Sequence, residues 1–294
     1  MKTLFLNSKN GLRNGCWVVI FIAALTIAGF LQVALQWIAK EMQLAGGLWV
    51  SSLGMLAVLG ATWAMLKLRR ENWTSVGLGL DKIWAQQFGV GVAIGIAQIL
   101  FAVLLLWVFG GVILALDPTR SLQTVGSGLI LFSLLAIKEE VLFRGFLFQR
   151  LRDGMGLWPT QILLAVLFAA AHWMNPGMHG AIAVAGSLGI FVSAIVFGMA
   201  YVRTGSLALP VGIHLGWNWM QGQVMGFGVS GKQMHGWLQP TLLDKPGWLT
   251  GADFGIEASV LGVAVDLLLL AGLFLWKRSI LAGEPALGLH KTAS

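Results

Sequence analysis

Long apolar stretches dominate the pattern of hydrophobic and polar positions along this chain. Eight of them are long enough to cross the hydrocarbon core of a bilayer, which is about 30 Å thick. They cover residues 15–38, 44–66, 88–116, 127–149, 158–174, 180–202, 207–227 and 257–276. The pattern predicts an all-α polytopic membrane protein, a bundle of about eight transmembrane helices embedded in the lipid bilayer.

Composition supports this class and excludes others. Hydrophobic residues make up 57% of the chain and charged residues 11%, with a mean hydropathy of +0.81. A soluble domain usually carries about 25% charged residues, so an ordinary cytosolic globule is excluded. The net charge of +7 does not indicate nucleic acid as a partner, because no basic run interleaves with aromatic residues. The single cysteine, Cys16, cannot form an internal disulfide.

The apolar pattern gives no linker and no internal repeat. We therefore expect a single integral membrane domain over residues 1–294, with a motif core at 127–225. The one long loop, residues 228–256, is rich in Gly, Trp and Pro and is expected to form an ordered cap on the outer face. Pairs of small residues four apart, such as Gly91 with Gly95 and Gly212 with Gly216, predict close packing between helices.

Basic residues predict the orientation, because Lys and Arg concentrate in cytoplasmic loops. With the N-terminus in the cytoplasm, the inner loops and ends hold Lys2, Lys9, Arg13, Lys67, Arg69, Arg70, Lys82, Arg150, Arg152, Arg203, Lys277, Arg278 and Lys291. The outer loops then hold Lys40, Arg120, Lys232 and Lys245. This asymmetry predicts a multi-pass protein of the cell inner or plasma membrane with both termini in the cytoplasm.

The fourth apolar stretch contains three charged residues that a membrane helix would normally exclude. Each charge costs at least ~2.5 kcal/mol at the helix centre, so those that occur usually face the bundle interior and have a function. Glu140 and Arg144 are one turn apart, which is the spacing of an ion pair, and Glu139 is left without a local partner. The alternative is a short helix that ends at the interface with Arg144 reaching the water. Apolar residues continue beyond the charges and argue against it.

Two histidines and an asparagine add to this set. Glu139 and His172 each lie about 13 residues from the turn between the fourth and fifth stretches, which places both roughly 20 Å from the same membrane face. His214 and Asn218 share one face of the seventh stretch, roughly 12 to 18 Å deep. An acid, two imidazoles and an amide form a hydrolytic set: a carboxylate and a His can take a proton from water, and donors can hold an oxyanion.

Other chemistries find no support in the sequence. No Ser or Cys stands in a recognisable relation to a His and an acid, so a covalent nucleophile has no candidate. The chain contains no HExxH helix, no P-loop and no dinucleotide-binding fingerprint after a strand.

The same residues resemble a known family. Residues 139–144 match EExxxR, Phe168 to His172 matches FxxxH, and His214 to Asn218 matches HxxxN. In this order on membrane helices, these motifs are similar to the signature of the CAAX protease and bacteriocin-processing (CPBP) intramembrane proteases, also called the Abi family. His172 with Asn175 and Pro176 resembles the HxxNP extension of bacterial members, and residues 247–259 are similar to a bacterial branch.

The resemblance implies an intramembrane endopeptidase. Glu139 and His172 would activate water, and His214 with Asn218 would stabilise the oxyanion. In a metalloprotease account, Glu139, His172 and His214 would instead supply three ligands to zinc, with water as the fourth. Glu140 and Arg144 would hold the geometry of the site. The substrate would be a peptide or protein, either membrane-anchored or prenylated.

Two other classes stay open at this point. A proton-coupled transporter would also bury Glu, His and Arg in its bundle. A non-catalytic membrane scaffold or immunity factor could use the same fold, since a fold does not determine a function.

Overall fold

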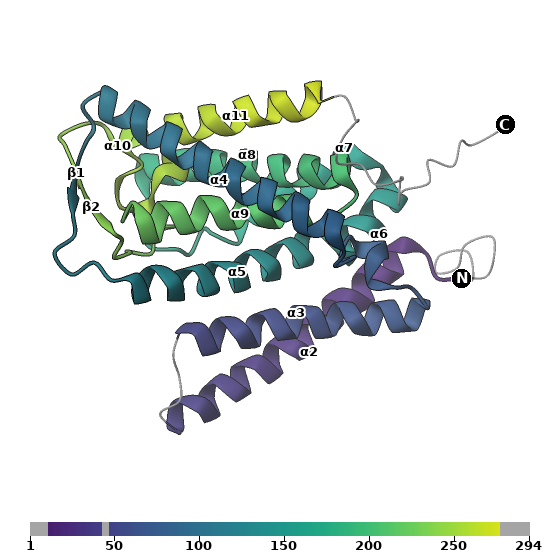
Figure 1. Ribbon diagram of the computed structural model, residues 1–294. Helices are drawn as coiled ribbons and strands as arrows, with labels where there is room; N and C mark the ends of the chain where they lie inside the picture. Colours follow the sequence, from purple (N-terminus) through teal and green to yellow (C-terminus); the bar gives the residue numbers. More distant parts are fainter. Residues whose placement is uncertain (1–10, 43–46, 277–294) are drawn as a thin grey trace.

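The computed structural model describes residues 11–42 and 47–276, and helices occupy every predicted apolar stretch (Figure 1). The helices are α2 (Asn14–Glu41), α3 (Gly47–Arg69), α4 (Lys82–Val108), α5 (Leu122–Arg144), α6 (Phe146–Met155), α7 (Leu157–Ala170), α8 (Gly180–Thr204), α9 (Ala208–Trp219), α10 (Gly247–Thr250) and α11 (Val260–Leu275). Shorter elements are η1 (Trp73–Val76), β1 (Val112–Leu116), η2 (Met220–Val224), β2 (Leu238–Leu242), η3 (Ala252–Phe254) and η4 (Ile256–Ala258). The predicted fold class, an all-α polytopic membrane protein, is confirmed.

The helices differ in how well they suit a bilayer. Among the described residues, α2, α3, α4 and α8 are each long and apolar enough to cross a membrane, and α7 and α11 are shorter apolar helices. Helix α5 carries four charged side chains in its last two turns, Lys138, Glu139, Glu140 and Arg144. The charged residues of the EExxxR motif therefore lie together at the end of one helix.

The third and fourth apolar stretches are not the continuous helices that the sequence predicts, but break at glycines. Helix α4 ends at Val108, and Gly110 takes a left-handed conformation (φ +63°) that stops it. The rest of the third stretch forms β1, which pairs antiparallel with β2 from Val112 opposite Leu242 to Leu116 opposite Leu238. The fourth stretch divides into α5 and α6 at Gly145, where a Cβ would collide with the carbonyl oxygen of Val141.

Three further boundaries differ from the sequence prediction, and the first of them concerns a site residue. Helix α7 ends at Ala170, so His172 lies in the turn that follows the helix rather than inside it. In the seventh stretch the α-helix ends at Trp219 and continues as the π-helical turn η2. The eighth helix begins at Val260, because residues 256–258 form η4.

Helix α9 lies at the centre of the bundle, between α4, α5 and α8 (Figure 1). Every residue from Ala208 to Trp217 is buried, so this helix contacts protein on all sides. Helices α4 and α9 cross at the glycine pairs that the sequence singled out. A methyl group on Gly91 would lie 2.9 Å from Cα of Gly212, and one on Gly216 would collide with the Val92 backbone. The glycines thus allow the backbone contact that positions α9.

Replacing Gly95 with alanine is expected to destabilise the protein by about 1 to 3 kcal/mol, because the new methyl group would lie 2.6 Å from the Trp217 nitrogen. Gly89→Ala is the matched control, since Gly89 is on the same helix and its added methyl group would have no neighbour within 4 Å. Thermal unfolding of both variants in detergent measures the effect. Equal melting temperatures would contradict the close crossing.

Residues 228–256, here called the cap, cover one end of the bundle. The cap contains β2, α10 and η3. A tight turn runs from Val229 to Lys232, with Ser230 (φ +48°) and Gly231 (φ +79°) both left-handed. The turn is fixed by a hydrogen bond that Gly231 N donates to Phe254 O over 2.9 Å. A methyl group on Gly231 would collide with the Pro176 carbonyl oxygen, so the cap packs directly on the turn that carries His172.

Candidate active site

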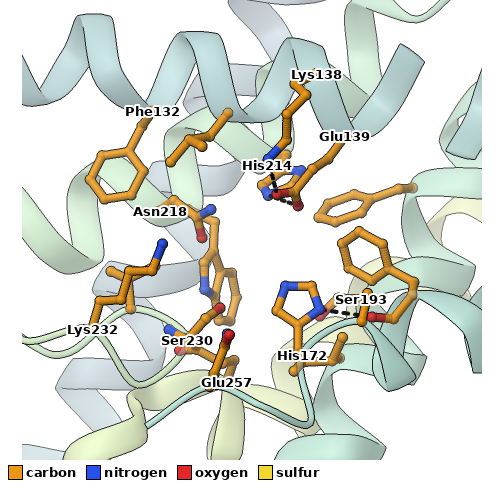
Figure 2. Close-up of a pocket in the computed structure, with 18 of the residues that line it drawn as sticks. Phe132, Lys138, Glu139, His172, Ser193, His214, Asn218, Ser230, Lys232 and Glu257 are labelled. Carbon is orange, nitrogen blue, oxygen red and sulfur yellow. Dashed lines mark hydrogen bonds and ion pairs between the residues drawn. The ribbon is translucent and has the colours of Figure 1, made fainter. Parts of the chain in front are cut away.

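One cavity of about 570 Å³ brings the predicted site residues together (Figure 2). Its lining includes Glu139 from α5, His172 from the turn after α7, and His214 and Asn218 from α9. Phe168, the first residue of the FxxxH motif, also lines it. Glu140 and Arg144 lie behind this wall and do not line the cavity. Four groups from three separate parts of the chain therefore face a shared volume.

Glu139 lies at the edge of the cavity with its side chain 20% exposed. The expectation that it has no local partner is wrong, because Lys138 Nζ lies 3.4 Å from Glu139 Oε1. The other carboxylate oxygen, Oε2, lies 3.9 Å from His214 Nε2. Sequence spacing missed Lys138, since adjacent residues do not normally share a helix face. Glu139 is thus a carboxylate between two cationic or hydrogen-bond-donating groups, with access to the cavity.

Behind Glu139, a buried network joins α5, α8 and α9. Arg144 Nη1 lies 3.3 Å from Glu140 Oε1, and the two side chains are 2% and 0% exposed. Arg144 also donates from Nη2 to the Ala194 carbonyl oxygen over 2.9 Å. His214 Nδ1 lies 2.8 Å from the same Oε1 of Glu140. Glu140 therefore links the arginine to the histidine, a contact that the sequence did not predict.

The ring of His214 is held in one orientation. Phe197 stacks on it at a centroid distance of 4.9 Å and an interplanar angle of 9°. Because Glu140 is a carboxylate, Nδ1 of His214 is the protonated nitrogen in their hydrogen bond. The other nitrogen, Nε2, is directed to Glu139 and the cavity. A carboxylate behind the ring can also balance a positive charge on it.

His172 has a different environment. Its Nδ1 lies 2.7 Å from the Phe168 carbonyl oxygen, which accepts a hydrogen bond, so this nitrogen carries the proton. The Phe168 ring lies 4.9 Å from the imidazole. In the neutral ring, Nε2 is then left as an acceptor, and the side chain lines the cavity. The hydrogen bond from His172 Nδ1 to the Phe168 carbonyl oxygen joins residues four apart, which gives a physical reason for the spacing of the FxxxH motif.

Asn218 lies one helical turn after His214 on the cavity side of α9 (Figure 2). Its side-chain amide makes no hydrogen bond to any residue in the described ranges, so its donors are free for a bound molecule. His214 Nε2 is a second donor on the same helix face when the ring is the imidazolium whose charge Glu140 balances. Such a pair can stabilise negative charge on an oxygen between them.

Glu139, His172 and His214, the three ligands of the metalloprotease alternative, are not arranged as a zinc site. Within residues 11–42 and 47–276, no group of three His, Cys, Asp or Glu side chains is close enough to hold a metal ion. The geometry of Glu139, His172 and His214 therefore does not match a three-ligand zinc site.

The cavity also contains polar residues that the sequence reasoning did not select. They are Gln98, Lys138, Ser193, Ser230, Lys232, Glu257 and Asp266. Glu257 lies in the segment that resembles a bacterial branch of the family, which was the one signal for it. Lys138 and Ser193 lie inside the motif core but outside its motifs, and the others come from helices and turns that meet the core only in three dimensions.

Comparison with known families agrees with this geometry. The model of the Rce1-like family, the type II CAAX prenyl endopeptidases, matches residues 121–220. Curated proteins and solved structures give no match to the chain. The matched segment runs from the start of α5 to the end of α9 and contains every motif residue named above. The match to the Rce1-like family therefore covers about a third of the chain and agrees with the family that the motifs resemble, the CPBP intramembrane proteases.

Proposed function

We propose that this chain is an active intramembrane endopeptidase that hydrolyses a peptide bond with water activated inside the cavity. The observation that carries the proposal is the convergence of Glu139, His172, His214 and Asn218 on one volume. The family supplies the reaction class, and the side chains present supply the acid, base and donor groups that hydrolysis needs.

Glu139 is proposed as the general base. Its carboxylate takes a proton from water as the oxygen attacks the scissile carbonyl carbon, and later gives that proton to the leaving amine. His172 Nε2 accepts a second hydrogen bond from the same water and orients it. This arrangement requires both groups to reach one water molecule, and both line the same cavity.

His214 and Asn218 are proposed to stabilise the oxyanion. In its imidazolium form, His214 donates from Nε2, and Asn218 donates from its amide, to the carbonyl oxygen as negative charge develops on it. Glu140 and Arg144 do not touch the substrate, and act by holding His214 in position through its Nδ1. No step of the proposal passes through a metal ion.

The proposed substrate is a peptide or protein segment that reaches the cavity from the membrane. A membrane anchor or a prenylated end would bring such a segment to the site. A transporter or a non-catalytic scaffold would have the same helices but would cleave nothing. Cleavage by purified protein therefore separates the proposal from both alternatives.

Replacing His172 with alanine is expected to lower kcat for peptide cleavage by about 10² to 10⁴, the range for losing one acid or base group. The measurement is cleavage of quenched fluorescent peptides by protein in liposomes. His179→Ala is the matched control, because His179 is exposed, lies near the same turn and does not line the cavity. Equal activity of the two variants would contradict the role of His172.

We also propose the orientation that the basic residues predict. Lys2, Lys9, Lys277, Arg278, Lys291 and both termini lie outside the described residues. Two contacts that pair proposed inner ends support this orientation: Arg69 packs on Trp17 at 5.0 Å, and Arg203 donates to the Phe274 carbonyl oxygen over 2.8 Å. At the opposite end, Arg120 lies 5.8 Å from the Trp237 ring.

Single cysteines at Gly154 and His235, with Cys16 replaced by serine, are expected to react with an impermeant thiol reagent from opposite sides of the membrane. Both positions are exposed, one at the end of α6 and the other in the cap. Labelling of intact cells and of inverted membrane vesicles measures the effect. Position 154 should label only in inverted vesicles, and labelling of both positions from one side would overturn the orientation.

A further inference from the structure

Two buried carboxylates line the cavity but take no part in the proposed hydrolysis. Glu257 in η4 is 7% exposed, and Asp266 in α11 is 4% exposed. Both lie outside the segment that matches the family model. Figure 2 shows the Glu257 carboxylate reaching into the cavity from the side opposite Glu139. Glu257 and Asp266 therefore line a part of the cavity that contains none of the family motif residues.

Both carboxylates are held by neutral donors. Glu257 Oε1 accepts from Ser230 N and, over 3.3 Å, from Ser230 Oγ, and its Oε2 accepts from Gln221. Asp266 Oδ1 accepts from Gln98 Nε2 over 2.9 Å, and its Oδ2 accepts from Ser193. In the described part of the chain, neither carboxylate forms an ion pair. A buried carboxylate without a cation is costly, and either a proton or a bound cation removes that cost.

The spacing of the two carboxylates follows from α11. A Cβ on Gly262 would lie 3.4 Å from Cα of Glu257, so these residues are in contact. Asp266 is one turn further along the same helix face, which corresponds to a rise of roughly 6 Å. The two carboxylates therefore come from neighbouring turns of the same wall of the cavity.

Gln98 adds an acceptor to this side of the cavity. It is 6% exposed and lines the cavity, and its Nε2 is used by Asp266. Its Oε1 is buried without any hydrogen-bond partner among the described residues. A buried carbonyl oxygen usually has a donor, so this atom indicates that a further donor belongs here.

The cationic side chains of the cavity do not fill this position. Lys138 pairs with Glu139 on the other side. Lys232 is exposed, and in Figure 2 its ammonium points towards Asn218 rather than towards Glu257. The acceptors around Glu257 and Asp266 are thus left for a ligand that carries donors and positive charge.

We infer that Glu257, Asp266 and Gln98 form a subsite for a cationic side chain of the peptide substrate, a lysine or an arginine. This inference rests on the proposed function, because it makes the subsite part of the peptidase cavity. Arginine and lysine offer only donors, which matches a wall of acceptors. The subsite would give this chain a preference for a basic residue near the scissile bond.

The first test measures binding without cleavage. Butylguanidinium is the probe, and butylurea is its neutral counterpart of similar shape. Butylguanidinium should raise the melting temperature of the purified full chain in detergent, and butylurea should not. Glu257→Gln and Asp266→Asn should each reduce that rise, whereas Asp244→Asn, an exposed cap carboxylate away from the cavity, should preserve it. An equal rise with both compounds, or none with either, would overturn the subsite.

The second test measures specificity. Peptides that carry arginine or its neutral analogue citrulline at each position around the cleaved bond are compared. At one position, wild-type kcat/KM should favour arginine by about 10- to 100-fold, the value of a charge-assisted hydrogen bond. Asp266→Asn should remove most of that preference, because it should lower kcat/KM for the arginine peptide more than kcat/KM for the citrulline peptide. Asp266→Asn is tested as well as Glu257→Gln, because Glu257 also accepts a hydrogen bond from the backbone of the cap turn and its replacement removes that contact.

The outcomes separate the subsite from the peptidase. Cleavage of both peptide sets at equal rates would reject the subsite and keep the peptidase. Charge-selective binding of butylguanidinium without cleavage of any peptide would support the cation site and reject the proposed function.

Discussion

Glu139→Gln is expected to abolish peptide cleavage while the protein stays folded. Glutamine nearly conserves the shape of the side chain but cannot take a proton from water. With water as the nucleophile, the rate should fall by more than the roughly 10²-fold that loss of a general base usually costs. The fold should tolerate the change, because Glu139 is partly exposed and its contacts to Lys138 and His214 are long, at 3.4 and 3.9 Å.

The measurement is single-turnover cleavage by purified protein in liposomes, with thermal unfolding of the same samples. Glu41→Gln is the control, since Glu41 is an exposed carboxylate at the end of α2. A rate for Glu139→Gln equal to that of the control would reject Glu139 as the base. A low rate together with a much lower melting temperature would reject the claim that its role is chemical.

The ion pair behind the site should give the second large effect. Replacing Glu140 or Arg144 alone is expected to cost about 3 to 5 kcal/mol of unfolding free energy. Loss of Glu140 leaves the buried Arg144 without its counter-ion, and loss of Arg144 leaves the Glu140 carboxylate with the His214 hydrogen bond in place of an arginine. The pair is almost fully buried, so water cannot compensate. The double variant Glu140→Gln, Arg144→Met should recover part of the loss, since it removes both charges together.

The measurement is a double-mutant cycle. It compares the unfolding free energies in detergent of the wild type, the two single variants and the double variant. Coupling of more than about 1 kcal/mol is expected for residues in contact. Losses that simply add would show that the two side chains do not interact in the folded protein.

Local sequence patterns predicted much of this protein. Each apolar stretch contains a helix, and the spacing of Glu140 and Arg144 matches a contact within one helix. The glycine pairs of α4 and α9 meet as expected, because small residues are the simplest way for helices to approach closely. These features depend on residues near one another in the chain, or on a general property of membrane helices.

The features that the sequence missed depend on partners far away in the chain. Residues 112–116 are apolar enough to extend a helix, yet they form β1 because β2 from the cap pairs with them. The bond from His214 to Glu140 joins residues 74 positions apart. Glu257 and Asp266 showed no motif of catalytic type, and their position at the cavity follows from the packing of α11 and the cap.

The central claim is that this chain cuts peptide bonds in the membrane through Glu139. The most direct measurement compares the new peptide termini in membranes from cells that produce either the wild type or Glu139→Gln at equal levels. We expect a defined set of termini in membrane-associated proteins that is present with the wild type and absent with the variant. Identical sets of termini in the two membranes would contradict the claim.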